Sequence, residues 1–222
     1  LFLAFSMVID KILSAADQQA IAKAIGGAER RTSGEIVVSV VESCDGYEHA
    51  LWKAAAFGAF AGVVAALGAW LFGNLWHEAW FWIGVPAPVG ALVGYLPTAT
   101  VPALRRWFAT PQVMARRSRQ RAASAFVRAE MFKTVDRTGI LIFLALFEHH
   151  VEVVADEGIT ATVAQSDWDE IAAGIARGMK RGEPLPELLG AIERCGELLD
   201  RHRLHPTAGD RDELPNRVRT ED

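Results

Sequence analysis

Two long uncharged segments lie close together in the first half of the chain, and they constrain its fold more than any other feature. The first covers Ala54–Phe72, and the second runs from about Ala79 to about Leu104. A helix needs about 20 residues to cross a hydrocarbon layer roughly 30 Å thick. Each segment is long enough for one span, so the sequence predicts an integral membrane protein with a transmembrane helical hairpin.

Basic residues flank the two segments on their outer sides but not between them. Lys53 precedes the first segment, Arg105 and Arg106 follow the second, and the short connector carries no Lys or Arg. Segments rich in Lys and Arg stay on the cytoplasmic side of a membrane. We therefore expect both termini and the soluble domain in the cytoplasm. Four tryptophans near the connector fit an aromatic belt at the far interface: Trp70, Trp76, Trp80 and Trp82.

A soluble protein with two buried core helices is the alternative. A core helix usually has one polar face, and neither segment has one. The prolines of the second segment make it the weaker candidate, because proline removes an amide donor and kinks a helix. Each segment has glycines four residues apart, a spacing that lets helix backbones approach closely. We expect these glycines to pair the two helices of one hairpin: Gly58 and Gly62, Gly90 and Gly94.

The residues outside the hairpin predict one α/β domain. Residues 1–50 supply its first helix and first strand, 51–104 form the hairpin, 105–204 supply the rest, and 205–222 form an extended tail. Strands are rich in β-branched residues, and helices show apolar residues every three or four positions. Ile140–Phe147 is apolar on both faces, which indicates a central strand. The other predicted elements are helices 14–31, 111–134 and 185–203, a helix opened by Ser166 and Asp169, and strands Glu35–Glu42 and Val151–Asp156. Ser14 and Asp17 predict a capping box at the start of the first helix, Gly34 predicts a left-handed stop after it, and residues 136–139 predict a turn.

Four carboxylates are expected to meet at one edge of the predicted sheet. If the first two strands run parallel and the third returns antiparallel, the first strand begins where the third ends. Oxygen-only ligands favour Ca²⁺ or Mg²⁺ over zinc. The alternative is that each carboxylate is a solvated turn residue or a helix cap. The candidate ligands are Glu35, Asp136, Asp156 and Glu157.

No motif indicates a catalytic or cofactor-binding residue. The sequence contains no EF-hand loop, P-loop, GxSxG or HExxH pattern. Its two cysteines, Cys44 and Cys195, are too few for a disulfide framework, and Cys195 is expected to be a buried thiol. A net charge of -4 gives no argument for nucleic acid. The arginines after the second segment fit anionic lipid headgroups instead.

The order of short segments outside the hairpin resembles the TPM domain family, found in thylakoid photosystem II repair proteins, a worm nicotinic-receptor accessory protein and many bacterial membrane proteins. The resemblance implies an α/β sandwich with a central mixed sheet in a bacterial inner membrane protein. This chain departs from the usual plan because its hairpin interrupts the domain. The resembling segments are Thr32–Val38, Thr138–Phe143, Val151–Ile159, Trp168, Leu185–Leu199 and Asp212–Asn216.

Two functions remain open. The first is a membrane-anchored interaction, assembly or regulatory module that binds another membrane-associated protein. The second is a metal-dependent phosphatase, because the resemblance implies calcium binding and acid phosphatase activity attributed to some plant relatives. The sequence favours the module, since it offers no positioned nucleophile with a base. A metal-assisted mechanism needs only carboxylates and water, so the phosphatase stays as the alternative.

Overall fold

The computed structural model describes residues 14–73, 84–134, 136–202 and 218–221. The chain divides into two compact units. The α/β unit contains Leu1–Cys44 and Ala115–Asp222, and the helical unit contains Asp45–Met114. The inserted unit is therefore wider at both ends than the predicted 51–104. Residues 79–83 of the predicted second span, Trp76 and the tail segment 212–216 lie outside the described residues.

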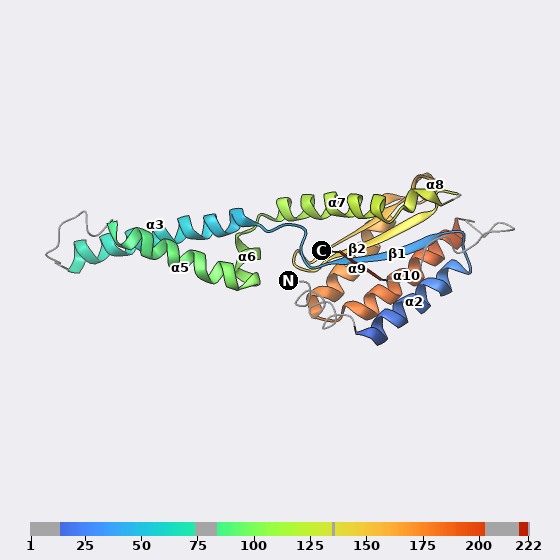
Figure 1. Ribbon diagram of the computed structural model, residues 1–222, viewed down its shortest axis with the longest axis horizontal. Coiled ribbons are helices and arrows are strands. Elements are labelled where there is room, and N and C mark those ends of the chain that lie inside the picture. Colours follow the sequence, from blue (N-terminus) through green and yellow to red (C-terminus); the bar gives the residue numbers. More distant parts are fainter. Residues whose placement is uncertain (1–13, 74–83, 135, 203–217, 222) are drawn as a thin grey trace. The chain divides into compact units, whose positions relative to one another are not determined.

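A mixed sheet forms the centre of the α/β unit (Figure 1). The strand order is β3-β2-β1-β4, with β1 parallel to β2 and to β4, and β2 antiparallel to β3. The expected arrangement of the first three strands is confirmed, with β2 in the interior. The strands are β1 (Glu35–Val41), β2 (Gly139–Ala145), β3 (His150–Ala155) and β4 (Arg219–Glu221).

Two features of the sheet correct the sequence predictions. The tail at 205–222 is not wholly extended coil, because its residues Arg219–Glu221 pair with Ser39–Val41 of β1. Three residues of mixed polarity carry no alternating pattern, so this short strand has no sequence signal. All seven residues of β1 are buried, as are all seven of β2. Burial on both faces is therefore shared by the two inner strands and is not unique to β2.

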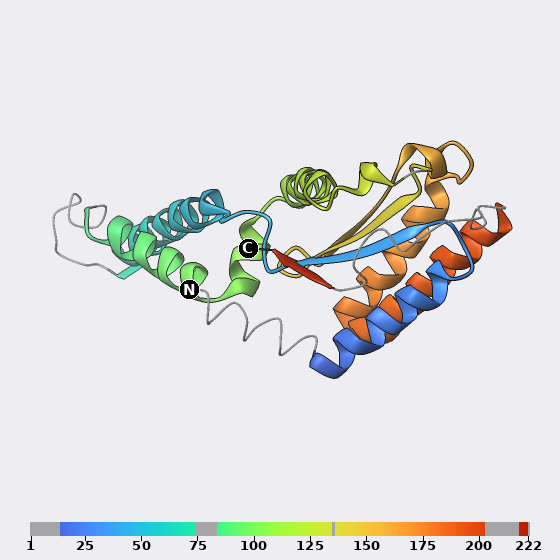
Figure 2. The same cartoon turned by 45° about the vertical axis from the view of Figure 1, so that its right-hand side comes forward.

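Helices cover both faces of the sheet (Figure 2). On one face, α7 (Pro111–Arg128) packs against alternate residues of β1 and β2, such as Val37 and Leu141. On the other face, the neighbouring residues Ile36 and Ile140 belong to a larger core with three helices. These helices are α2 (Ala15–Glu29), α9 (Gln165–Arg181) and α10 (Pro184–Arg201). The period-two alternation of strand side chains thus separates two cores.

Helix boundaries agree with their predicted signals in one case and differ in two. Ser14 and Asp17 form the predicted capping box of α2. Ser166 is not a cap, because α9 begins at Gln165 after Ala164 and Asp169 accepts from Gln165 instead. Gly34 is not a left-handed helix stop. A Cβ there would lie 2.2 Å from Cδ1 of Leu199, so glycine is needed for close packing with α10.

The helical unit contains two antiparallel helices in backbone contact, α3 (Glu48–Gly73) and α5 (Pro86–Thr100). A Cβ on Gly90 would lie 2.2 Å from the carbonyl oxygen of Gly58, and one on Gly94 would lie 2.1 Å from that of Ala54. Along this register the last residue of α5 lies opposite the first residue of α3. The glycine spacing therefore pairs the two helices of one chain, as expected.

The predicted second span, about 79–104, does not form one straight helix. α5 ends at Thr100, and α6 (Pro102–Phe108) follows at an angle of 115°. Pro102 is the cause, because proline disfavours the helical conformation of the residue before it, here Val101. Val101 has φ -107° and ψ 107°, which is extended backbone.

We predict that Gly90→Ala will destabilise the helical pair by about 1–3 kcal/mol, the usual cost of overpacking a close contact. Gly68 on α3 is the matched control, since a Cβ there would meet nothing within 4 Å. Gly68→Ala should leave stability unchanged or raise it by up to about 1 kcal/mol, because alanine is favoured over glycine inside a helix. Unfolding of the full chain in mixed micelles, followed by circular dichroism, measures both variants. Equal losses would contradict the close contact.

Candidate functional site

The sheet brings the predicted carboxylate segments to one edge. Glu35 is the register partner of Gly139 in the parallel pair of β1 and β2. On the other side of β2, the backbone N–H of Asp156 donates to the carbonyl oxygen of Gly139 at 2.9 Å. Glu35 and Asp156 therefore lie on the two sides of Gly139. Two strand spacings separate their Cα atoms by about 10 Å.

Asp156 forms an ion pair that sequence reasoning missed. Its side chain is buried and accepts from Nε and Nη2 of Arg137 at 2.9 and 3.0 Å. It also accepts from the backbone N–H of Glu157 at 2.7 Å, which caps the short helix α8 (Glu157–Thr160). The hydrogen bond to Asp156, followed by the charge of Asp156, raises the pKa of Arg137. The edge is therefore organised around a guanidinium–carboxylate pair.

The other three predicted ligands differ in exposure. Glu35 is buried, Asp136 is exposed, and Glu157 is 87% exposed with one oxygen 3.8 Å from Nη2 of Arg137. Across the described ranges, no three His, Cys, Asp or Glu residues form a group that could hold a metal ion. A Ca²⁺ or Mg²⁺ site at this edge stays a prediction. A cation there would have to compete with Arg137 for Asp156.

The turn before β2 is held close to α8. Arg137 has φ 55°, in the left-handed region, and Gly158 lies directly against its backbone. A Cβ on Gly158 would lie 2.4 Å from the carbonyl oxygen of Asp136. In the sequence, only the position of Arg137 in a turn, two residues before Gly139, pointed to a special role for this residue. Nothing in that pattern identifies its partner.

A second polar cluster lies at the opposite ends of β1 and β2. Glu148 is buried and accepts from the backbone N–H of Cys44 at 2.8 Å and from Oγ of Ser43 at 3.3 Å. Burial, followed by the charge of Glu148, raises the pKa of the Cys44 thiol to about 12. Burial does the same to Cys195, which is fully buried as predicted. A raised pKa disfavours the thiolate, which is the nucleophilic form of cysteine, at both positions.

An open groove of about 720 Å³ runs between α2 and α10. Its floor is made of small residues, and a Cβ on Gly27 or Gly190 would meet no atom within 4 Å. Its rim carries three cations and one carboxylate, so the groove is net positive. The rim residues are Lys23, Arg30, Arg31 and Glu193, and the other lining residues are Ala20, Ala24, Gly27, Leu189 and Gly190.

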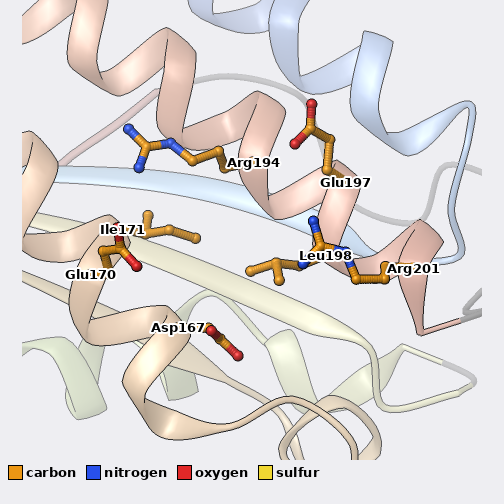
Figure 3. A pocket seen from close by; sticks show the side chains of 7 residues that line it. All are labelled: Asp167, Glu170, Ile171, Arg194, Glu197, Leu198 and Arg201. Atoms are coloured by element: carbon orange, nitrogen blue, oxygen red, sulfur yellow. The ribbon is translucent and has the colours of Figure 1, made fainter.

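A smaller hollow of about 160 Å³ lies between α9 and α10 (Figure 3). Three carboxylates and two guanidinium groups line it together with Ile171 and Leu198. In Figure 3 the carboxylate of Glu197 points away from that of Asp167. Mixed charges on exposed side chains give this hollow less selectivity for a charged partner than the groove between α2 and α10. The charged lining residues are Asp167, Glu170, Arg194, Glu197 and Arg201.

These observations define an α/β domain interrupted by an antiparallel helix pair. No protein-family model matches the chain, and no curated protein matches it. Among solved structures, the chain is similar to the NMR structure of BA42 protein from the psychrophilic bacterium Bizionia argentinensis. The TM-score is 0.56 at 20% sequence identity, with 94% of this chain and 95% of that chain covered. At this identity the similarity concerns the fold alone.

We predict that Asp156→Ala will lower the free energy of unfolding by about 1–2 kcal/mol, because α8 loses its N-terminal cap. Glu157→Ala is the matched control, since Glu157 is 87% exposed. It should change stability by less than about 0.5 kcal/mol. Chemical denaturation of the full chain in detergent, monitored by near-UV circular dichroism, measures both. Equal effects of the two variants would contradict the role given to Asp156.

Proposed function

We propose that this protein is a membrane-tethered interaction module: α3 and α5 form a transmembrane hairpin, and the α/β unit is a TPM-type domain that binds another membrane-associated protein. The mixed sheet is what the TPM resemblance implied, which supports this part of the proposal. The proposed location is a bacterial inner membrane, with both termini cytoplasmic.

The exposure of α3 carries the proposal. Only 6% of its most apolar 18-residue stretch is buried within the protein. A core helix of a soluble protein would be mostly buried, so that alternative is disfavoured. Transfer of exposed apolar surface out of water is worth about 25 cal/mol per Å². The exposed apolar side chains of α3 include Phe57, Phe60, Val64, Leu71 and Phe72.

Of the two helices, α3 is long enough to cross a membrane and α5 is shorter. α3 has 26 residues, which gives about 39 Å at 1.5 Å per residue and exceeds a hydrocarbon layer of roughly 30 Å. α5 has 15 residues, or about 22 Å. α5 alone is therefore shorter than the hydrocarbon layer, and residues 79–83 of the predicted second span lie outside the described residues.

We predict that a reporter fused after Asp222 will be active only in its cytoplasmic form, because Lys and Arg flank the hairpin on its outer sides only. The measurement uses paired fusions: one reporter that works only in the cytoplasm and one that works only in the periplasm. A fusion within the connector, after Asn74, is the control and should show the reverse pattern. Periplasmic activity after Asp222 would contradict the orientation.

The groove between α2 and α10 is the proposed docking surface. Its small floor residues leave room for a backbone or a short side chain, and its rim places Lys23, Arg30 and Arg31 against one carboxylate, Glu193. Charge complementarity therefore favours a segment rich in Asp and Glu. Clusters of arginine and lysine recognise acidic motifs in other proteins in the same way.

We predict that a fluorescent helical peptide of Glu and Ala will bind the full chain in nanodiscs, measured by anisotropy, and that added salt will weaken binding. Lys23→Glu with Arg31→Glu should reduce affinity at least about tenfold, since tenfold corresponds to 1.4 kcal/mol. Arg177→Glu with Lys180→Glu on α9 makes the same charge change outside the groove and should have little effect.

A second variant separates shape from charge. Gly190→Leu fills the groove without changing its charge, and replacing glycine inside a helix with leucine favours the helix. This variant should fold at least as well as the wild type and lose binding. Tight binding of the peptide by Gly190→Leu would place the docking surface elsewhere.

The metal-dependent phosphatase remains the alternative proposal. It needs Asp156 to leave Arg137 and hold a metal with an open coordination position. Turnover of p-nitrophenyl phosphate by the full chain with Ca²⁺ or Mg²⁺, lost in folded Asp156→Asn, would support it.

A further inference from the structure

Aromatic side chains gather where α3 begins and α5 ends. The rings of Trp52 and Tyr95 lie 6.0 Å apart between centroids. On α6, the ring centroids of Trp107 and Phe108 lie 4.8 Å apart, and the centroid of Phe108 lies 6.3 Å from that of Phe57 on α3. Trp52 and Trp107 are 69% and 73% exposed. Large exposed tryptophans at one end of a helix pair are typical of a membrane–water interface, where the ring is apolar and the N–H is wet.

Two side-chain hydrogen bonds hold α6 within the helical unit. Nη2 of Arg105, in the middle of α6, donates to the carbonyl oxygen of Ala99 in α5 at 2.6 Å. A cation at this position satisfies one of the carbonyls left open at the end of α5. Beyond its end, Nζ of Lys53 on α3 donates to Oγ1 of Thr110 at 3.0 Å. Side-chain hydrogen bonds on both sides therefore hold the 115° bend. α6 lies across the end of the helix pair at which α3 begins and α5 ends.

Trp52 and Trp70 both lie on α3, and their separation can be compared with the distance between the two interfaces of a membrane. Trp52 and Trp70 are separated by 70 − 52 = 18 residues of one helix. At 3.6 residues per turn this is five turns, so both lie on the same face, about 27 Å apart along the axis. A hydrocarbon core is about 30 Å thick. Trp70 belongs to the predicted far belt, so Trp52 lies at the depth of the near one.

We infer that α6 is an interfacial helix that lies in the plane of the cytoplasmic leaflet, with Trp107 at the boundary of headgroups and acyl chains and the basic pair Arg105 and Arg106 beside anionic phospholipid headgroups. This inference rests on the proposed membrane hairpin. Basic and aromatic residues on a helix parallel to the surface bind anionic bilayers by both apolar burial and charge. α6 then sets the depth at which the hairpin stops.

The test places nitroxide labels on the full chain and measures their depth by power saturation in nanodiscs. Single cysteines replace Ala103 on α6, Leu92 on α5 and Val127 on α7, all exposed side chains, and Trp107 is kept in place. Leu104→Cys is a second site on α6 in case Ala103→Cys does not fold. Wild-type protein carried through the same labelling is the blank, because it contains Cys44, which is half-buried, and Cys195, which is buried.

In discs of phosphatidylglycerol and phosphatidylcholine, the α6 label should report headgroup depth, Leu92 the hydrocarbon and Val127 water. In discs of phosphatidylcholine alone, the α6 label should shift toward water. An α6 label as exposed to water as Val127, or one at the same depth in both lipids, would overturn the inference while the membrane hairpin stands. Leu92 in water would instead overturn the proposed hairpin itself.

Discussion

Parallel pairing of β1 with β2 is the interaction on which the rest of the molecule depends. Between Val41 and Gly139 lie 139 − 41 − 1 = 97 residues, and the cost of closing a loop grows with its length. The antiparallel helix pair reduces that cost. Its two helices run in opposite directions, so the end of α5 lies opposite the start of α3. Close glycine contacts set the register of the two helices.

Each end of the inner strands is secured by a buried carboxylate that bonds to backbone. Asp156 caps α8 and holds Arg137 beside the start of β2, and Glu148 accepts from Cys44 where the chain leaves β1. A buried carboxylate is costly unless hydrogen bonds compensate for lost water. Both residues therefore hold irregular backbone in place. Glu148 does so next to the start of the inserted unit.

Elements with a strong local pattern could be predicted from the sequence. The β-branched run of β1, the doubly apolar β2 and the capping box of α2 all indicate their structure directly. The failures share one cause, which is that tertiary partners decide the outcome. β4 forms because its backbone can pair with that of β1. Arg137 binds Asp156 because its left-handed backbone conformation positions the guanidinium group. The second predicted span is a separate case with a local cause, because Pro102 keeps Val101 extended and thereby ends α5.

The pairing of β4 attaches residues 219–221 to the central sheet. β1 is buried along its whole length, yet its side away from β2 is covered over Ser39–Val41 by the last few residues of the chain. Proteolysis of those residues would bare a row of unpaired N–H and C=O groups on an apolar strand, which is a template for strand addition by another molecule. The pairing of these three residues with β1 therefore protects that strand from pairing with a second copy of the chain.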